Sequence, residues 1–506
     1  MAATAVSTHP HLANETRAPS SSYSDDHIYP VHLLDGAKYQ QCILTMFIRF
    51  NDVLDPGKIK ESISQLLSIG DWRKLGGRFR TKASKYPKVH NPLLGSKLEI
   101  HVPQRFTAAR PAFQFAHEEF ESSISEHPLG RDLPDAQGDE VSLSPPLDHL
   151  RRCGLGPGFP TVMADLIDRD APQLCFKIIS FNDATVFANT FSHCTWDISG
   201  VKAFMGSLQL VLDGREDDVP PMLGASSDIL AEIADQHKRC ALDTEPLLQT
   251  SIERKEGDES PPQDPLLEER IIRIPLATLE RLRGVVAKED PMEDDETFMN
   301  CQTDELLMAL TVKQIAKAQL RPRPLKLLNI YNARLVIPRI AKAKGIYGQN
   351  LVLLSPQFLP QEVATGSMAQ IIYSQRECFA QSAVPDNVAR SLQVVLGAIK
   401  ADLDITALRD NGEAEPLLIN NLVRLSTNID VDLSSAVVRQ GRSSQTRMNG
   451  LGTPDFCYLT LPNNTYGMMR VTTLGSYNGD GCWMFGELPS RAWELIYEAA
   501  LEETAG

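Results

Sequence analysis

A histidine and an aspartate four residues apart are the side chains of this sequence best suited to chemistry. They lie in "FANTFSHCTWDISGVKAF", residues 187–204, as His193 and Asp197, with Gly200 behind them. A neutral imidazole accepts a proton near pH 7, so His193 can act as a general base. The alternative is a histidine at an ordinary strand end, followed by an aspartate that caps the next helix. Both interpretations can hold together, because Asp197 can fix the loop while His193 does chemistry.

The residues around His193 predict a strand before it and a helix after it. "QLCFKIISFNDATVFANTFSH" contains two apolar runs that flank Asn182-Asp183, a pair typical of a tight hairpin turn. Behind His193, apolar residues from Val201 to Leu208 recur at helical spacing. His193 is therefore expected where a strand passes into a helix. Of the eleven histidines, it alone is followed by Asp at the fourth position.

The rest of the chain predicts alternating strands and helices. Residues 42–50 are expected to form a strand, followed by a helix capped by Asp55 with Pro56 at its first position. Residues 107–160, rich in Pro, Gly and acidic side chains, predict an elaborated surface loop. A further helix is expected to be capped by Thr303, and a long helical stretch to span roughly 360–403.

This alternation predicts an α/β fold of two domains. The low-hydrophobicity stretch "ERKEGDESPPQDP" marks the linker between them. The expected organisation is a disordered leader over 1–22, an N-terminal domain over 23–213, a crossover linker over 214–266 and a C-terminal domain over 267–506.

Composition excludes several classes of function. The 506 residues carry 65 acidic and 50 basic side chains, a net charge of −15, and no basic block, which argues against a nucleic-acid partner. Nine cysteines are scattered singly, without a C-x-x-C pair, as in a reduced intracellular protein. No signal peptide and no apolar run long enough to span a membrane are visible, so we expect a cytoplasmic protein.

Other catalytic motifs are missing. There is no G-x-S-x-G elbow and no Walker A loop. His117-Glu118 opens like H-E-x-x-H, but Glu121 takes the place of the second histidine. The acidic run 293–296 is typical of a solvated loop. We therefore expect no metal site.

At this point the sequence resembles a known family. "VFANTFSHCTWDISGVKAF" is similar to the H-x-x-x-D core of the BAHD-type acyl-CoA-dependent acyltransferases, including their trichothecene 3-O-acetyltransferase-like fungal branch. The likeness continues in order along most of the chain. The similar segments are "YPVHLLDGAKYQ", "GKIKESISQLLSIGDWRKLGGRFR", "TDELLMALTVKQIAKAQ", "YNARLVIPRIAKAKGIYGQN" and "SYNGDGCWMFGELPSRAWELI".

The resemblance implies a fold, a reaction and substrates. The fold would be two related chloramphenicol-acetyltransferase-like domains, each a mixed sheet with flanking helices, that meet along a channel. His193 would lie in the middle of the channel, with acetyl-CoA or another acyl-CoA reaching it from one face and a small-molecule alcohol from the other. Asp197 would turn away from the reaction and pair with Arg334, and a bidentate carboxylate–guanidinium pair would hold the loop. We also expect a monomer.

One family motif departs from its usual form. Where the family has D-F-G-W-G-K-P, this chain reads "MNGLGTP", residues 448–454. Gly450 and Gly452 survive, either as a turn that needs positive φ or as a cofactor-binding loop that supports the acyl-CoA channel. The missing aspartate weakens the case for an unmodified acyl-CoA mechanism.

The remaining candidates near the motif are less specific. Acyl transfer needs an oxyanion stabiliser, and Ser434 and Ser435 lie roughly where the family has a Ser/Thr-rich segment. Cys194 adjoins His193 but should face the opposite side if strand alternation continues, so it is not expected to be a nucleophile. Trp196 is expected in a pocket wall or in the core.

Three hypotheses follow. The first is an O-acyltransferase, expected to use acetyl-CoA, that modifies a terpenoid, polyketide or alkaloid. The second keeps the fold and His193 but performs a cyclisation or isomerisation by general base without CoA. The third is a non-enzymatic binding protein.

Overall fold

The computed structural model describes most of the chain, in residues 25–81, 98–133, 140–236, 266–289, 301–382, 384–400, 414–422, 429–441, 449–462, 465–475 and 481–502. The leader predicted for residues 1–22 lies outside these ranges, as do residues 237–265 of the predicted linker. The boundaries drawn at 213 and 267 stay predictions.

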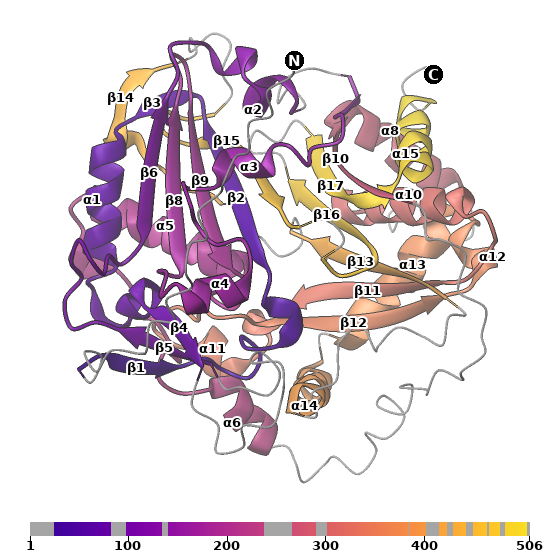
Figure 1. The fold of residues 1–506 in the computed structure, drawn as a ribbon. Coiled ribbons are helices and arrows are strands. Elements are labelled where there is room, and N and C mark those ends of the chain that lie inside the picture. Colours follow the sequence, from indigo (N-terminus) through magenta and orange to yellow (C-terminus); the bar gives the residue numbers. More distant parts are fainter. Residues whose placement is uncertain are drawn as a thin grey trace, which may run out of the picture.

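Two halves lie side by side, each built on a mixed sheet (Figure 1). The main sheet of the N-terminal half has five strands among the described residues, in the order β15-β2-β9-β8-β6. β6 and β8 are parallel, and the other neighbours are antiparallel. The bounds are β2 (Ile43–Phe50), β6 (Gln114–Glu119), β8 (Leu174–Ser180), β9 (Thr185–Ser192) and β15 (Pro454–Thr460). The hairpin predicted around Asn182-Asp183 is confirmed, since β8 and β9 pair on either side of it.

The C-terminal half contains a seven-stranded sheet among the described residues, in the order β12-β11-β13-β16-β17-β10-β7. β13 is parallel to both of its neighbours, and the remaining pairs are antiparallel. The bounds are β7 (Ser142–Leu143), β10 (Leu267–Pro275), β11 (Leu325–Asn332), β12 (Val352–Leu359), β13 (Glu415–Asn421), β16 (Met469–Gly475) and β17 (Gly481–Pro489). Smaller sheets join β1 (His27–Pro30), β5 (Leu98–Val102) and β4 (Arg78–Thr81), and β3 (Asp52–Leu54) with β14 (Val437–Gln440).

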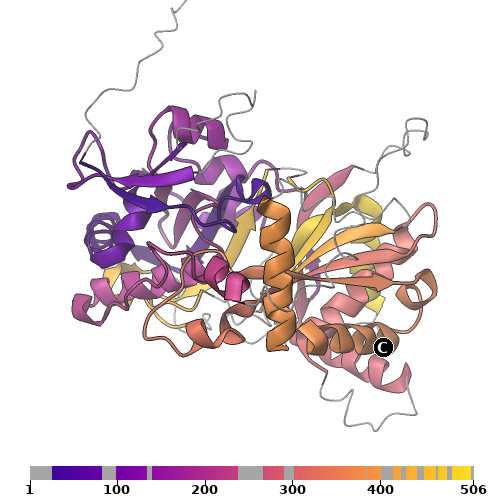
Figure 2. The ribbon, with the colours of Figure 1, turned by 90° about the horizontal axis from the view of Figure 1, so that it is seen from below.

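Helices cover the sheets with their apolar sides. In the N-terminal half, α1 (Pro56–Leu66) and α5 (Ile198–Leu212) contact each other and share one core with the sheet. In the C-terminal half the same is true of α8 (Leu276–Glu289), α10 (Thr303–Ala318), α13 (Met368–Ser382) and α15 (Ser490–Glu502). Two further helices, α6 (Ile229–Gln236) and α14 (Pro385–Lys400), contact each other, and α14 stands in orange across the junction of the halves in Figure 2.

Short helices and 3-10 turns complete the described structure. They are η1 (Lys38–Gln40), η2 (Gly70–Gly76), η3 (Ile124–Glu126), α2 (Pro128–Arg131), α3 (Arg151–Gly154), α4 (Met163–Asp168), η4 (Glu216–Asp218), η6 (Ala333–Leu335), α11 (Pro338–Ala341), α12 (Gln361–Ala364) and η8 (Ser434–Ala436).

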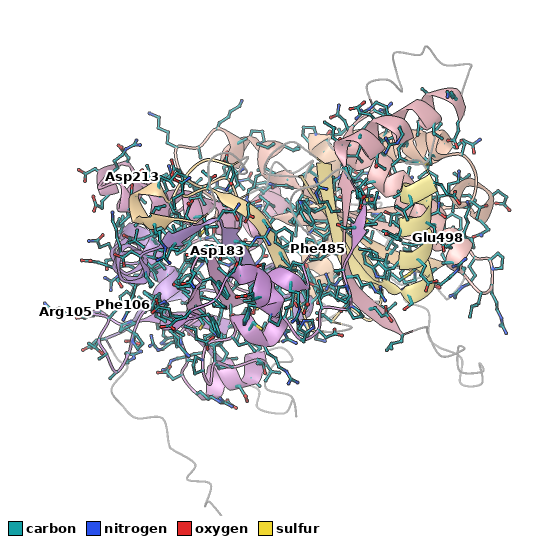
Figure 3. All side chains as sticks on the ribbon, turned by 90° about the horizontal axis from the view of Figure 1, so that it is seen from above. Arg105, Phe106, Asp183, Asp213, Phe485 and Glu498 are labelled. Atoms are coloured by element: carbon teal, nitrogen blue, oxygen red, sulfur yellow. The ribbon has the colours of Figure 1, made fainter. Side chains whose placement is uncertain are left out.

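The halves exchange strands. β15 comes from the C-terminal part of the chain but pairs with β2, and β7 comes from the N-terminal part but pairs with β10. A hydrophobic cluster joins side chains of both sheets, among them Phe47, Tyr458 and Phe485, and Figure 3 labels Phe485 where the halves meet. The junction is therefore a packed core, which can hold groups from both halves in fixed positions.

Some predicted elements differ from the structure. The predicted surface loop over 107–160 contains β6, which pairs with β8 as the edge strand of the main sheet. The predicted helix over 360–403 is divided into α12, α13 and α14, and Pro385 begins the last of these because proline fits the first turn of a helix but not its interior. The cap predicted at Thr303 belongs to Gln302, one residue earlier. None of the described helices has the length and apolarity needed to cross a membrane.

Candidate active site

His193 lies directly after β9, at the junction predicted from the sequence. Its backbone N–H donates to the carbonyl of Cys42, at 2.9 Å, which continues the pairing of β9 with β2. On the other side, Asn350 Nδ2 donates to the His193 carbonyl, at 2.8 Å. Both backbone groups of His193 are thus held, one by each half of the molecule.

The imidazole of His193 lines a cavity between the halves. The cavity contains about 660 Å³ of empty space, its open mouth included. The other lining residues are Tyr39, Gln40, Leu328, Ile330, Val352, Leu354, Val395, Leu418, Tyr466 and Met468. Most of these are apolar and come from the C-terminal half. The site is therefore a largely apolar chamber that presents a single imidazole.

The two ring nitrogens of His193 have different surroundings. Nδ1 is buried and has no hydrogen-bond partner among the described residues. Nε2 is not among the buried atoms that lack a partner, and it is the nitrogen accessible from the cavity. Burial lowers the pKa of the imidazole, and the carbonyl of His193 itself, the Asp197 carboxylate and Asn350 oppose that shift. A ring that stays neutral and opens through Nε2 is suited to accept a proton.

Asp197 caps the helix that follows. Its Oδ1 accepts hydrogen bonds from the backbone N–H groups of Ser199 and Gly200, at 3.0 and 3.1 Å. Its Oδ2 accepts the N–H of Leu351, at 3.0 Å. Gly200 is needed here, because a Cβ would lie 2.2 Å from the carbonyl oxygen of Gly348. Asp197 therefore ties the start of α5 to the C-terminal half.

Arg334 is the charged partner of Asp197. Its Nη2 lies 2.9 Å from Asp197 Oδ1 and 2.5 Å from the carbonyl of Gln349, while Nε donates to the carbonyl of Tyr347, at 3.0 Å. The resemblance implied a bidentate pair, but Arg334 contacts only Oδ1 of Asp197. The second carboxylate oxygen, Oδ2, accepts the N–H of Leu351 instead. Arg334 instead distributes its donors over the loop that contains Asn350.

Comparison with known proteins then gives the class of the chain. No protein-family model matches it. O-acyltransferase pboC of Aspergillus ustus is 28% identical over 458 residues, 87% of this chain and 91% of the relative. Acetyltransferase adrJ of Penicillium rubens is 25% identical over 96% of this chain and 98% of the relative.

Solved structures share the fold. F. graminearum TRI101, complexed with coenzyme A and deoxynivalenol, gives a TM-score of 0.60 at 11% identity, covering 92% of this chain and 96% of that one. Vinorine synthase gives a TM-score of 0.56 at 12% identity, covering 96% and 95%. Along almost its whole length the chain is thus similar to fungal acetyltransferases and O-acyltransferases, and it shares the fold of TRI101 and vinorine synthase. The resemblance stated from the sequence, the enzyme class and the two-part chloramphenicol-acetyltransferase-like fold are confirmed.

Sequence reasoning did not single out two residues of the acyltransferase that hold the His193 loop. Asp35 Oδ1 accepts hydrogen bonds from the backbone N–H and from Nδ2 of Asn350, at 2.9 and 2.8 Å. Burial raises the pKa of Asp35 to about 6, although Lys74 and Asn350 lower it. Asp35 and Asn350 both lie in segments that carried the family resemblance, so the signal was present but was not resolved to single residues.

Cys194 faces away from the cavity that His193 lines. Its thiol donates to the carbonyl of Gln40, at 3.4 Å, and it lines a separate, smaller space of about 310 Å³ with Asp35 and Lys74. Burial raises the pKa of the Cys194 thiol well above its ordinary value. Trp196, 1% exposed, packs in the core against Phe191. Cys194 is therefore not poised as a nucleophile in the acyltransferase.

The glycine loop of the acyltransferase lies at the opposite end of α5. Gly452 has a φ of +68°, and its N–H donates to Asp52 Oδ2, at 2.8 Å. Neither Gly450 nor Gly452 lines the His193 cavity. The hydroxyl of Ser435 donates to Asp213, the residue that directly follows α5. Figure 3 labels Asp213 on the outer side of the N-terminal half.

The length of α5 separates this loop from the imidazole. A helix of 15 residues extends over about 22 Å. The structure therefore does not bring Ser435, or its neighbour Ser434, to the atoms that His193 can reach. It also shows no cluster of potential metal ligands among the described residues.

Proposed function

We propose that this protein transfers an acyl group, in the first place acetyl, from acyl-CoA to a hydroxyl of a small natural product, with His193 as the general base. The main support is the imidazole in an apolar cavity at the junction of the halves, with Nε2 open to it. The names of the acetyltransferase and O-acyltransferase relatives support the reaction class. The TRI101 structures, which contain coenzyme A together with T-2 or deoxynivalenol, support the pairing of substrates.

The proposed reaction needs only one acid–base group. Nε2 of neutral His193 takes the proton of the alcohol while the alcohol oxygen attacks the thioester carbonyl. When the C–S bond breaks, the imidazolium returns that proton to the departing sulfur, which leaves as the CoA thiol. Because burial lowers the pKa of His193, the ring starts in the neutral form at pH 7.

Asp197 and Arg334 are proposed as positioning residues. Together they connect the start of α5 to the loop that carries Asn350. Asn350 in turn contacts the carbonyl of His193. Loosening this connection would move the imidazole relative to both substrates, and small displacements of a catalytic group cost rate.

The acceptor is proposed to be largely apolar. Leu328, Ile330 and Leu354 line the cavity, and such a wall favours a terpenoid, polyketide or alkaloid over a sugar. A role of Gly450 and Gly452 in supporting the acyl-CoA channel stays a prediction, and any contact would be with a part of acyl-CoA remote from the thioester. The cytoplasmic location, the monomeric state and the lack of a metal and of a nucleic-acid partner also stay predictions from the sequence.

The altered glycine loop favours one alternative, a general-base cyclase or isomerase that does not use CoA. In that case His193 would remove a proton from carbon or oxygen, and the same cavity would hold the single substrate. A purely binding protein is not proposed, because the relatives are named as enzymes.

Labelling separates the two reactions. Purified protein is incubated with acetyl-CoA labelled in the acetyl group and with metabolite extract from its source, and label is followed into small molecules. We expect one or a few labelled esters, and isothermal titration should show binding of acetyl-CoA. Absence of both label transfer and acetyl-CoA binding would overturn the acyltransferase proposal in favour of the cyclase or isomerase.

A further inference from the structure

Gln40 places a second polar side chain in the His193 cavity. The residue is 2% exposed and lines the same space as the imidazole. Its backbone is fixed on both sides, since its N–H donates to the carbonyl of Ala37, at 2.9 Å, and its own carbonyl accepts the thiol of Cys194. The position of Gln40 is therefore set by the residue that follows His193.

The side-chain amide of Gln40 is available to a ligand. Within the part of the chain that the structure describes, the amide makes no hydrogen bond to protein. Neither its oxygen nor its nitrogen is shut off from solvent without a hydrogen-bond partner. Gln40 is buried, but its amide has no protein partner and is accessible. We therefore infer that the amide faces the cavity that Gln40 lines. It offers two N–H donors and one carbonyl acceptor there.

Acyl transfer leaves a role for such a donor. As the alcohol attacks, the thioester carbonyl oxygen becomes an oxyanion, and a donor in a dry cavity stabilises it strongly. The serines near the glycine loop cannot supply that donor, because they lie at the far end of α5. Most of the rest of the lining is apolar. Its other polar groups are the hydroxyls of Tyr39 and Tyr466, each with one O–H donor, whereas the Gln40 amide offers two N–H donors.

We propose that Gln40 is a catalytic residue whose Nε2 donates a hydrogen bond to the thioester carbonyl oxygen as that oxygen becomes negative. The proposal rests on the acyltransferase function proposed above. No proton is transferred to or from Gln40. When the C–S bond breaks, the electron pair on the oxygen re-forms the carbonyl, and the ester leaves with Gln40 unchanged.

The test uses Gln40→Leu, which keeps the size of the side chain and removes the donor. CoA release from acetyl-CoA is measured with a thiol reagent, first with water as the only acceptor and then with the alcohol identified by labelling. We expect kcat to fall about 10²-fold in both assays, with the KM for acetyl-CoA changed less than threefold and the melting temperature unchanged. Gln40→Glu, which puts a negative charge against the oxyanion, should be at least as slow.

Gln41→Leu is the matched control. The amide of this neighbouring glutamine is already bonded to the carbonyl of Gly36, at 3.2 Å, so its loss should leave kcat as in the wild type. Tyr39→Phe and Tyr466→Phe test the two hydroxyls of the cavity, and both variants should keep kcat within threefold of the wild type. A full kcat in Gln40→Leu, or a loss of kcat confined to Tyr39→Phe or Tyr466→Phe, would overturn the assignment.

Two other outcomes are distinguishable. If Gln40→Leu only raises the KM for the alcohol and leaves release to water intact, Gln40 positions the acceptor and the oxyanion role is wrong. If His193→Ala also releases CoA at the wild-type rate, or if the wild type releases none, the proposed function itself fails, and this inference fails with it.

Discussion

The two ends of α5 are held by similar contacts but differ in one respect. At the first end, Asp197 accepts backbone N–H groups and Arg334, and beside it His193 keeps a buried Nδ1 without a partner among the described residues. At the last end, Ser435 bonds to Asp213, and Gln209 accepts the N–H of Asp432. Both ends are thereby tied to the C-terminal part of the chain, and the first end also presents a group that the fold leaves unused.

This difference separates support from chemistry. A buried polar atom without a partner costs stability, so a fold retains one where something other than stability is selected. At the last end of α5, Ser435 and Gly452 each make a hydrogen bond that supports the fold, so a structural role explains both residues. At the first end they account for Asp197 but not for the imidazole. We therefore expect the chemistry implied by the family resemblance at the first end.

The largest effect is expected from His193→Ala. Removal of the general base should lower kcat for acyl transfer by 10²-fold or more, while the melting temperature stays within a few degrees, since Nδ1 makes no hydrogen bond to the described protein. Steady-state kinetics and thermal melts check both. Retention of more than a tenth of the wild-type kcat would remove His193 from the reaction.

The next effect is expected from breaking the Asp197–Arg334 pair. Both side chains are largely buried, so Asp197→Asn or Arg334→Ala should lower the free energy of unfolding by about 3 kcal/mol. The two variants should resemble each other, and the double variant should cost much less than the sum of the two. Loss of turnover in Asp197→Asn with unchanged denaturant unfolding would instead give Asp197 a direct part in the reaction.

At the other end of α5, Gly452→Ala should destabilise the protein. Gly452 has positive φ, and an added Cβ would lie 2.2 Å from the backbone nitrogen of Ser434. The backbone conformation alone is expected to cost about 1–3 kcal/mol. The control is Gly450→Ala, whose Cβ would meet the flexible Thr453 side chain at 3.3 Å. Equal destabilisation by both variants would contradict the interpretation that only Gly452 needs to be glycine. A raised KM for acetyl-CoA would support the predicted role of the loop in the acyl-CoA channel.

A smaller effect concerns pH. Because burial lowers the pKa of His193, the base form persists to lower pH than in a free histidine of pKa about 6.5. The ratio kcat/KM should therefore rise with pH, with its midpoint below 6.5. The folded protein also binds this proton less tightly than the unfolded chain, so the contribution of His193 to stability declines as pH falls below about 6.5. An apparent pKa above 6.5 in the rate profile would contradict the assignment.

The smallest effect is expected from Ser435→Ala. Ser435 is exposed, and its hydrogen bond to Asp213 should contribute below about 1 kcal/mol. Since it lies a helix length from His193, kcat should stay within twofold of the wild type. A tenfold fall in kcat would mean that the serines reach the reacting atoms after all, and the contrast between the two ends of α5 would be lost.

Local signals predicted many elements correctly. The Asn182-Asp183 turn between apolar runs predicted the β8–β9 hairpin, and Asp55 followed by Pro56 predicted the start of α1. Such signals work because a turn or a cap depends on residues a few positions apart. The loop predicted over 107–160 failed for the opposite reason. β6 is held there by pairing with β8, a distant partner that composition does not reveal.

The candidate site divides in the same way. His193 and Asp197 could be found from their spacing, and Arg334 from the family resemblance. Asn350 and Gln40 lie in segments that carried the resemblance but were not singled out, because what distinguishes them is a contact with the His193 loop from far along the chain. Ser434 and Ser435 were placed near the reaction by their order in the sequence, and the length of α5 takes them away from it.

The sequence by itself determined that a strand ends at an imidazole, that an aspartate begins the next helix, and that the chain belongs among alternating α/β proteins. These follow from turn chemistry, capping and apolar periodicity, which act over a few residues. Only the tertiary structure decided which nitrogen of His193 is open, which residues hold its loop and which amide shares its cavity. Those properties arise where the packing of two interlocked halves brings together residues separated by more than a hundred positions, such as His193 and Asn350.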